Sequence, residues 1–178
     1  KLQDIKKILN TMEKQKHSEL GGIYDILPGQ YEYFRKILTV AQDCADFYKF
    51  RRIEPRILQK PKGLSKKVKD MLMEEDLLLE TKDNVSFKLL STPIISVAHA
   101  FVDHEMAGLS RPLRLWQFGP FFKTIKGDVV QEFELGFEVF GSRDLIIDAQ
   151  IIQIFFGIFD RLKVKDLIIE LNSTGDAR

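Results

Sequence analysis

The sequence has very little cysteine, no large excess of charge of one sign and no long apolar run, and each shortage excludes a class of protein. Its 178 residues include one cysteine, Cys44, so an internal disulfide is excluded. The 27 basic and 26 acidic side chains leave a net charge of +1, so no overall field favours nucleic acid or a membrane surface. Neither a signal peptide nor an apolar stretch long enough to cross a bilayer is recognisable. We therefore expect a cytoplasmic protein with no membrane partner.

The remaining composition is typical of one folded domain. Hydrophobic residues make up 44% of the chain, which is enough for a core, and nothing indicates a disordered or fibrous protein. Residues 1–20 are predicted to contain a separate amphipathic helix, because apolar side chains recur there at helical spacing among lysines. These side chains are Leu2, Ile5, Ile8, Leu9 and Met12.

A long hairpin between Leu113 and Gly141 is the clearest pattern in the chain. Its first arm, residues 113–123, is aromatic and aliphatic, which is typical of a largely buried strand. Gly119-Pro120 predicts a bulge or bend within that arm. Residues 124–128 are expected to make the turn, because a lysine, a glycine and an aspartate follow one another there.

The second arm of the hairpin alternates between two kinds of side chain. One face carries Gln131, Phe133, Leu135, Phe137 and Val139, and the other carries Glu132, Glu134, Gly136, Glu138 and Phe140. Three carboxylates therefore share one face of the strand. Such a row beside a glycine indicates either a solvated sheet face or the floor of a polar cavity, and the pattern alone favours the solvated face.

Helices and shorter strands are expected around the hairpin. Cys44 falls on the apolar stripe of the helix predicted at 31–48, where a small buried filler is the preferred interpretation. His99 and His104 share a later helix at a spacing that does not resemble a metal site, so no metal is expected. The prediction is an α+β fold with a mainly antiparallel sheet flanked by helices. The helices are predicted at 31–48, 58–75, 92–104 and 145–162, and the strands at 51–55, 77–81, 85–90 and 167–171.

The hairpin also carries a family resemblance. Gly119-Pro120-Phe121-Phe122-Lys123, a turn, and then QEFELGFEVFG over residues 131–141 closely resemble motif 2 of the class II aminoacyl-tRNA synthetases in its histidyl version. GGIYDILPG over residues 21–29 is similar to the segment that opens the catalytic domain in that family. The helix from Tyr31 and the strand that ends at Pro55 resemble motif 1, and Asn172-Ser173 resembles the end of the first catalytic half.

The resemblance covers residues 21–178 and implies a partial class II synthetase catalytic core. The family's later catalytic half and its anticodon-binding domain have no counterpart in this sequence. By resemblance, the cofactor is ATP with magnesium, the substrates are histidine and tRNA, and motif 1 forms a homodimer.

The resemblance places the ATP site at Lys123. In the family an arginine clamps the α-phosphate at this position, so Lys123 is the candidate catalytic and ATP-binding residue. A lysine keeps the positive charge and loses the planar two-pronged fork. Arg114 is the second candidate for an ATP phosphate, and Asp128 in the loop would oppose phosphate binding.

The resemblance assigns the substrate site to four residues. Thr92 occupies the place of a glutamate that holds the substrate ammonium, so a charge-assisted hydrogen bond is lost there. Gln131 matches the family and Glu134 replaces a family glutamine. Glu138 matches the glutamate that contacts the substrate imidazole, which makes it the best-retained specificity residue.

These matches and departures leave two functions open. One is the front half of a histidine–tRNA ligase with a weakened site. The other is a non-catalytic paralogue that acts as a dimeric regulatory or ligand-binding module, and fold resemblance does not choose between them. Because activation depends on positioning and charge stabilisation, we expect no histidine-dependent pyrophosphate exchange from this chain alone.

Overall fold

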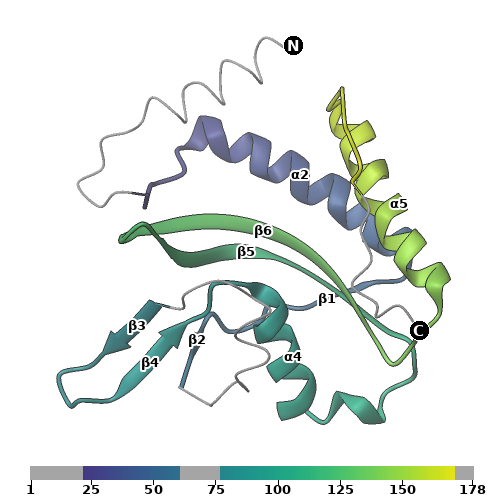
Figure 1. Ribbon diagram of the computed structural model, residues 1–178. Coiled ribbons are helices and arrows are strands. Elements are labelled where there is room, and N and C mark those ends of the chain that lie inside the picture. The colour runs from purple at the N-terminus through teal and green to yellow at the C-terminus, as the bar shows by residue number, and fades with distance from the viewer. Residues whose placement is uncertain (1–21, 61–76, 171–178) are drawn as a thin grey trace.

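The structure is a computed structural model that describes residues 22–60 and 77–170. Two three-stranded sheets are ordered β1-β5-β6 and β2-β4-β3, and helices lie on both sides of the larger sheet (Figure 1). The expected α+β class is confirmed. In chain order the elements are α2 (Pro28–Phe47), β1 (Arg51–Arg52), β2 (Leu58–Gln59), β3 (Leu77–Glu80), β4 (Ser86–Leu89), α4 (Pro93–Asp103), η1 (Met106–Gly108), β5 (Leu113–Ile125), β6 (Asp128–Phe140) and α5 (Leu145–Leu162).

The predicted hairpin is present as β5 and β6, which pair antiparallel along their whole length from Leu113↔Phe140 to Ile125↔Asp128. The turn is shorter than expected, with Lys126 and Gly127 alone between the strands. Both have positive φ, 52° and 89°, as a two-residue type I′ turn requires. The right-handed twist of the strands favours this turn, so pairing continues closer to the tip than the composition indicated.

The bulge predicted at Gly119-Pro120 is wrong, because both residues remain in register, opposite Glu134 and Phe133. The N–H of Ile53 donates to the Trp116 carbonyl, so even-numbered residues of β5 direct their backbone groups away from β6. The N–H that Pro120 lacks would therefore point to the outer edge of β5. Of the described strands β1 alone pairs there, at residues 115 and 116, so the proline interrupts no ladder.

The two faces of the hairpin bury different layers. Helices α2 and α5 cover one face (Figure 1). On that face Trp116 and Phe137 stack at 6.2 Å between ring centroids and belong to the core with residues of α2 and α5. The other face meets α4, where Val97 packs with Leu113 and Leu115. The main core, on the α2–α5 side, consists of Ala41, Cys44, Ala45, Phe50, Trp116, Phe137, Ile154 and Ile158.

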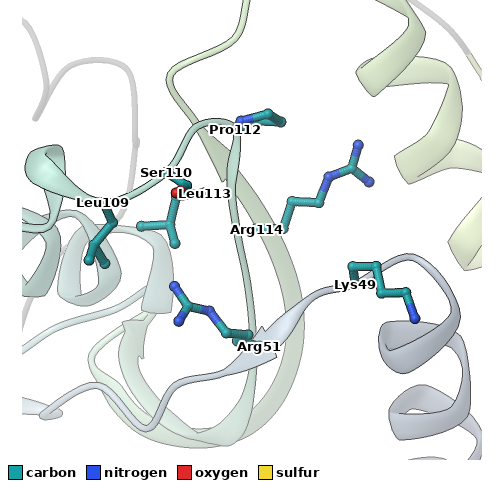
Figure 2. Close-up of a pocket in the computed structure, with 7 residues that line it drawn as sticks. All are labelled: Lys49, Arg51, Leu109, Ser110, Pro112, Leu113 and Arg114. Carbon is teal, nitrogen blue, oxygen red and sulfur yellow. The ribbon is translucent and has the colours of Figure 1, made fainter.

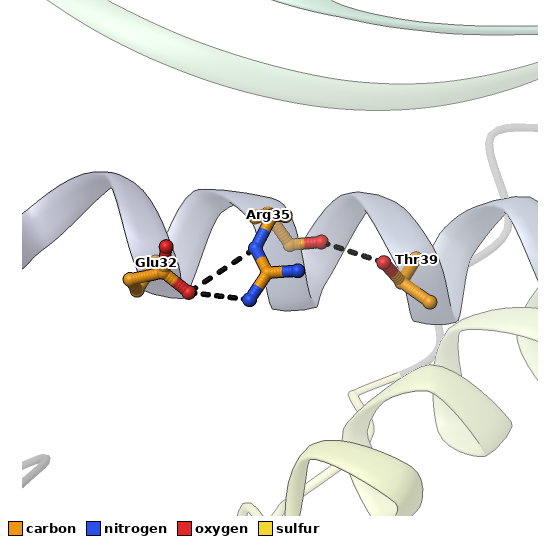
Figure 3. Close-up of polar contacts among 3 residues, drawn as sticks. All are labelled: Glu32, Arg35 and Thr39. Atoms are coloured by element: carbon orange, nitrogen blue, oxygen red, sulfur yellow. Dashed lines mark hydrogen bonds and ion pairs between the residues drawn. The ribbon is translucent and has the colours of Figure 1, made fainter. Parts of the chain in front are cut away.

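Helix α2 begins earlier than predicted, at Pro28, a residue suited to a first helical turn because its missing N–H needs no partner there. Its solvent side carries a polar row in which Glu32 accepts from Arg35 Nε at 3.1 Å and Thr39 donates to the Arg35 carbonyl at 2.9 Å (Figure 3). Its inner side buries Cys44, so the interpretation of Cys44 as a small core filler is confirmed. Burial also raises the pKa of the Cys44 thiol, which disfavours a reactive thiolate.

The smaller sheet departs from one prediction. The hairpin expected at 77–90 is present as β3 and β4, but Leu58 and Gln59 form strand β2 in place of the start of a helix. The strand is favoured because β4 supplies a partner for its backbone and Gln59 reaches α4. There Gln59 Nε2 donates to Ser96 Oγ at 3.3 Å, and its Oε1 contacts His99 Nδ1. His99 therefore belongs to a polar link between β2 and α4.

Helix α5 has the predicted bounds and starts at an Asp144 cap, whose side chain accepts from the Ile146 N–H at 3.1 Å. The strand predicted at 167–171 is wrong over residues 167–170, which have no regular secondary structure and pair with no described strand. An apolar segment becomes a strand only where a partner satisfies its backbone.

Several predictions lie outside the described residues. They are the amphipathic helix within 1–20, the 61–75 part of the basic helix, the end of the last strand and Asn172-Ser173. The division between residues 20 and 21 also stays a prediction. No helix in the described part of the chain is both long and apolar enough to span a membrane.

Candidate functional site

Side chains from both strands of the hairpin meet on the face that carries the three glutamates of β6. This surface, called the acidic face below, is continuous because opposite residues of an antiparallel pair point the same way. Its β5 members lie opposite β6 members in the pairs Leu115↔Glu138, Gln117↔Gly136, Gly119↔Glu134, Phe121↔Glu132 and Lys123↔Val130.

The centre of the acidic face is Gly136, and the side chains of Glu138 and Gln117 occupy the space that its missing side chain leaves. A Cβ at residue 136 would lie 2.5 Å from Glu138 Oε1 and 2.7 Å from Gln117 Nε2. The missing side chain of Gly136 thus lets a carboxyl group and an amide reach over the same point. Glu138 Oε2 is buried and makes no hydrogen bond within the described residues. The site therefore offers a buried acceptor that nothing described satisfies.

The environment of Glu138 changes its acidity. Burial and, to a smaller extent, the charge of Glu134 together raise the pKa of Glu138 from 4.5 to about 7. The carboxyl group therefore exchanges its proton near neutral pH. A donor or cation placed above Gly136 would favour the ionised form, because it would replace the solvation that burial removes.

Gln117 is a residue that the sequence analysis did not select. Its side chain is only 1% exposed, and neither its amide nitrogen nor its amide oxygen has a hydrogen-bond partner among the described residues. An unpaired buried amide costs about 1–3 kcal/mol. The available signal was the one uncharged polar residue of the first arm, which the register places opposite Gly136.

Lys123 also lies on the acidic face, but toward the hairpin tip. Its Nζ forms an ion pair with Glu132 Oε2 at 2.7 Å. Glu138 lies opposite Leu115, eight positions along β5 from Lys123, a span of about 26 Å in an extended strand. Burial raises the pKa of the Tyr24 phenol, and the charge of Glu132 adds to this rise, so Tyr24 lies close enough to Glu132 to feel its charge. Lys123 and Glu138 thus share a face without meeting.

Arg114 occupies the opposite face of the sheet, among the residues that pack on α2 and α5. Its guanidinium donates to the Tyr48 carbonyl at 3.2 Å and to Gln150 Oε1 at 3.0 Å, and it lies 5.5 Å from the Phe50 ring centroid. These contacts join the end of α2 to α5. The structure therefore does not bring Arg114 together with Lys123, and the prediction of a shared ATP site gains no support from this placement.

The other two predicted substrate residues are also apart from Glu138. Gln131 is an odd-numbered residue of β6, so its side chain lies on the face opposite Glu134 and Glu138. Its backbone N–H donates to the Gly22 carbonyl at 3.1 Å. Thr92 is the N-cap residue of α4, and its side chain makes no capping hydrogen bond. Of the predicted substrate residues, Glu134 and Glu138 share one face of β6, and the charge of Glu134 acts on Glu138.

A separate cavity of about 290 Å³ lies at the start of β5. Lys49, Arg51 and Arg114 line it with Ser110 and apolar residues, but their charged ends do not converge on one point (Figure 2). Within residues 22–60 and 77–170, no group of three or more His, Cys, Asp or Glu side chains is placed to hold a metal ion.

Comparison with known proteins gives one consistent result. The histidine–tRNA ligase of Lysinibacillus sphaericus is 30% identical over 162 residues, which cover 87% of this chain and 38% of that ligase. The chain thus spans well under half the length of the curated relatives it matches. No protein-family model matches it.

Solved structures show the same fold. The apo histidyl-tRNA synthetase of S. aureus is 23% identical with a TM-score of 0.66, over 81% of this chain and 34% of that one. An ATP phosphoribosyltransferase regulatory subunit/histidyl-tRNA synthetase from Bacillus halodurans is 17% identical with a TM-score of 0.72, over 85% of this chain and 39% of that one. By sequence and fold, over the part of its relatives that it spans, this chain belongs to the histidyl-tRNA synthetase family.

Proposed function

We propose that the acidic face binds the imidazole side chain of histidine, as part of a core of the histidine–tRNA ligase type. One observation carries the proposal: the buried carboxyl group of Glu138 lies over Gly136 and has an oxygen that no described residue satisfies. An imidazole N–H is a donor of the right kind for that oxygen. The name of the relatives, histidine–tRNA ligase, agrees with this choice of ligand.

Binding of free histidine should be weak. Glu134 adds negative charge beside Glu138 and favours a ligand with a cationic group. By family resemblance the substrate ammonium would meet Thr92, whose neutral side chain forgoes a charge-assisted hydrogen bond. We therefore expect a dissociation constant of about 1 mM or weaker, which corresponds to about 4 kcal/mol.

The larger activity to which this site would contribute is activation of histidine with ATP and magnesium, followed by transfer to tRNA. We propose it for a cytoplasmic homodimer that uses α2 and β1 as its interface. Lys123 is the phosphate ligand in this scheme, and it must first leave Glu132. The pair has partly exposed side chains, and such pairs contribute only about 0–1 kcal/mol, so phosphate can compete for the lysine.

The alternative, a regulatory or ligand-binding module without catalysis, is favoured by two observations. Arg114 is committed to Tyr48 and Gln150 on the other face, which leaves Lys123 as the one predicted phosphate ligand on the acidic face. One structure of the same fold carries the description of a regulatory subunit. Such a module would keep the histidine site and lack the exchange reaction.

Titration of the purified chain with L-histidine, followed by NMR chemical shifts, tests the proposed binding. Wild type should bind in the millimolar range, and Glu138→Gln should lose binding because it keeps the size of the side chain and removes its charge. Glu80→Gln is the matched control, since it removes one exposed carboxylate from β3. Equal affinity of wild type and Glu138→Gln would refute the assignment.

Histidine-dependent exchange of pyrophosphate into ATP separates the two functions. Exchange by this chain would favour the ligase, and we expect none. Histidine binding without exchange would favour the binding module.

A further inference from the structure

We propose that the outward side of helix α5 is a self-association surface, on which the α5 helix of a second copy of this chain packs antiparallel. The surface, called the α5 stripe below, consists of Leu145, Ala149, Ile152, Phe156 and Phe159. The inference goes beyond the proposed function, because no residue of the stripe belongs to the acidic face or to the interface proposed on α2 and β1.

Helix α5 has apolar side chains on two opposite sides. Its inner side buries Ile147, Ile154 and Ile158. The stripe is centred about 180° around the helix axis from Ile154, and there Leu145 is 80% exposed and Phe156 is 54% exposed. A helix that is apolar on both sides is normally covered on both, and a continuous exposed apolar surface marks an interaction site.

The spacing of the stripe indicates that another helix covers it. Its residues follow one another in steps of four and three, which is the spacing of a coiled-coil seam. In an antiparallel pair of α5 helices, Ala149 lies over Phe159 of the second copy, and Ile152 lies over Phe156 of the second copy. Each of these layers joins an aromatic ring to a smaller side chain, so the stripe is complementary to itself.

The charges beside the stripe favour an antiparallel second copy. Asp148 and Asp160 flank the stripe on opposite sides, Lys163 follows the end of the helix, and all three residues are exposed. The antiparallel arrangement brings Lys163 within one helical turn of Asp148 of the second copy. It also places Asp160 beside the first turn of the second α5, where free N–H groups favour a carboxylate. An anionic membrane surface would be repelled by the same two carboxylates.

Cross-linking through an introduced thiol tests this arrangement. Gln153 is exposed beside the stripe, at the position that lies nearest to its own copy in the antiparallel pair. A short bismaleimide should therefore capture Gln153→Cys as a covalent dimer. Ile146→Cys is the matched control on the same side of the helix, because residue 146 would lie about 21 Å along the axis from its own copy. The native Cys44 is buried, so wild type should give no covalent dimer.

Phe156→Asp supplies a second test, since it places a carboxylate where Ile152 of the second copy would pack. Added to Gln153→Cys, it should lower the yield of covalent dimer about tenfold. Circular dichroism should show an unchanged fold, because Phe156 does not belong to the core. The position of the cross-link decides the test, since total mass would also include a pair formed through α2 and β1.

Four results would overturn the inference. Equal cross-linking of Gln153→Cys and Ile146→Cys would indicate random collision, and a yield that Phe156→Asp leaves unchanged would remove the stripe from the contact. A thiol at residue 153 that does not react with a monofunctional maleimide would show that another part of the chain covers the stripe. A thiol that reacts without giving any covalent dimer would show that no second copy binds there. None of these results bears on histidine binding at Glu138.

Discussion

The raised pKa of Glu138 should make the stability of the free chain depend on pH in a defined window. Below pH 4.5 the carboxyl group is protonated in the folded and the unfolded state, so it contributes no difference. Between pH 4.5 and about 7 the unfolded chain loses its proton first, which stabilises the unfolded state and lowers the free energy of unfolding. Above about pH 7 both states are ionised and the loss is complete.

The size of the loss follows from the same shift. A pKa that moves from 4.5 to about 7 corresponds to about 3 kcal/mol, at about 1.4 kcal/mol per pH unit. Glu138→Gln mimics the protonated carboxyl group at every pH. We therefore expect the variant to match wild type near pH 4.5 and to exceed it by about 3 kcal/mol at pH 8, when histidine is absent.

Urea denaturation of the two proteins, followed by circular dichroism from pH 4.5 to pH 8, measures this difference. All other titrating groups are shared, so subtracting one curve from the other isolates residue 138. Glu80→Gln supplies the baseline for removing one negative charge from an exposed strand. A difference between wild type and Glu138→Gln that stays constant with pH would refute the reasoning from burial.

Three further changes test other contacts. Gly136→Ala should abolish histidine binding, measured by NMR titration, because its Cβ would lie within 2.7 Å of Gln117 Nε2 and Glu138 Oε1 and would displace both groups. Unchanged binding would show that histidine does not bind at Glu138. Arg114→Met should lower the free energy of unfolding by about 2 kcal/mol, because it removes two hydrogen bonds that join α2, β5 and α5. Histidine affinity should stay unchanged, and a loss of affinity in the folded variant would show that Arg114 belongs to the binding site. Sedimentation at micromolar concentration should show a dimer if α2 and β1 form the motif 1 interface, and monomer alone would contradict that interface.

The long amphipathic patterns were the parts of the fold that the sequence could predict. The alternation of Glu132 through Glu138 placed the carboxylates on one face, and α5 kept its predicted bounds. The two-residue strand β2 was not predicted, because its formation depends on pairing with β4 and on a contact with α4 that the local sequence does not indicate. Residues 167–170 have strand composition without a strand, since no described neighbour pairs with them.

The candidate site was predicted in part, and strand register decides the placement of Arg114 and Gln117. A bulge at Gly119-Pro120 would have shifted the alternation by one residue and placed Arg114 on the face of Lys123. Without the bulge, Arg114 and Lys123 lie nine positions apart on β5, and their side chains point to opposite faces of the sheet. The same uninterrupted register places Gln117 opposite Gly136, which is the contact the sequence analysis lacked. Strand register therefore decides which polar residues can act together.

The uneven edges of the larger sheet have a consequence for the behaviour of the chain in solution. Pro120 blunts the outer edge of β5, whereas β6 has no proline and, past the contact of Gln131 with Gly22, pairs with no other described strand on its outer side. Identical β6 edges that stacked in register would place glutamate beside glutamate, and this repulsion protects the chain from fibrillar growth. Acid removes that charge. We therefore expect turbidity and thioflavin fluorescence to rise at millimolar concentration as the pH falls below about 4, and storage above that pH to keep the chain dispersed.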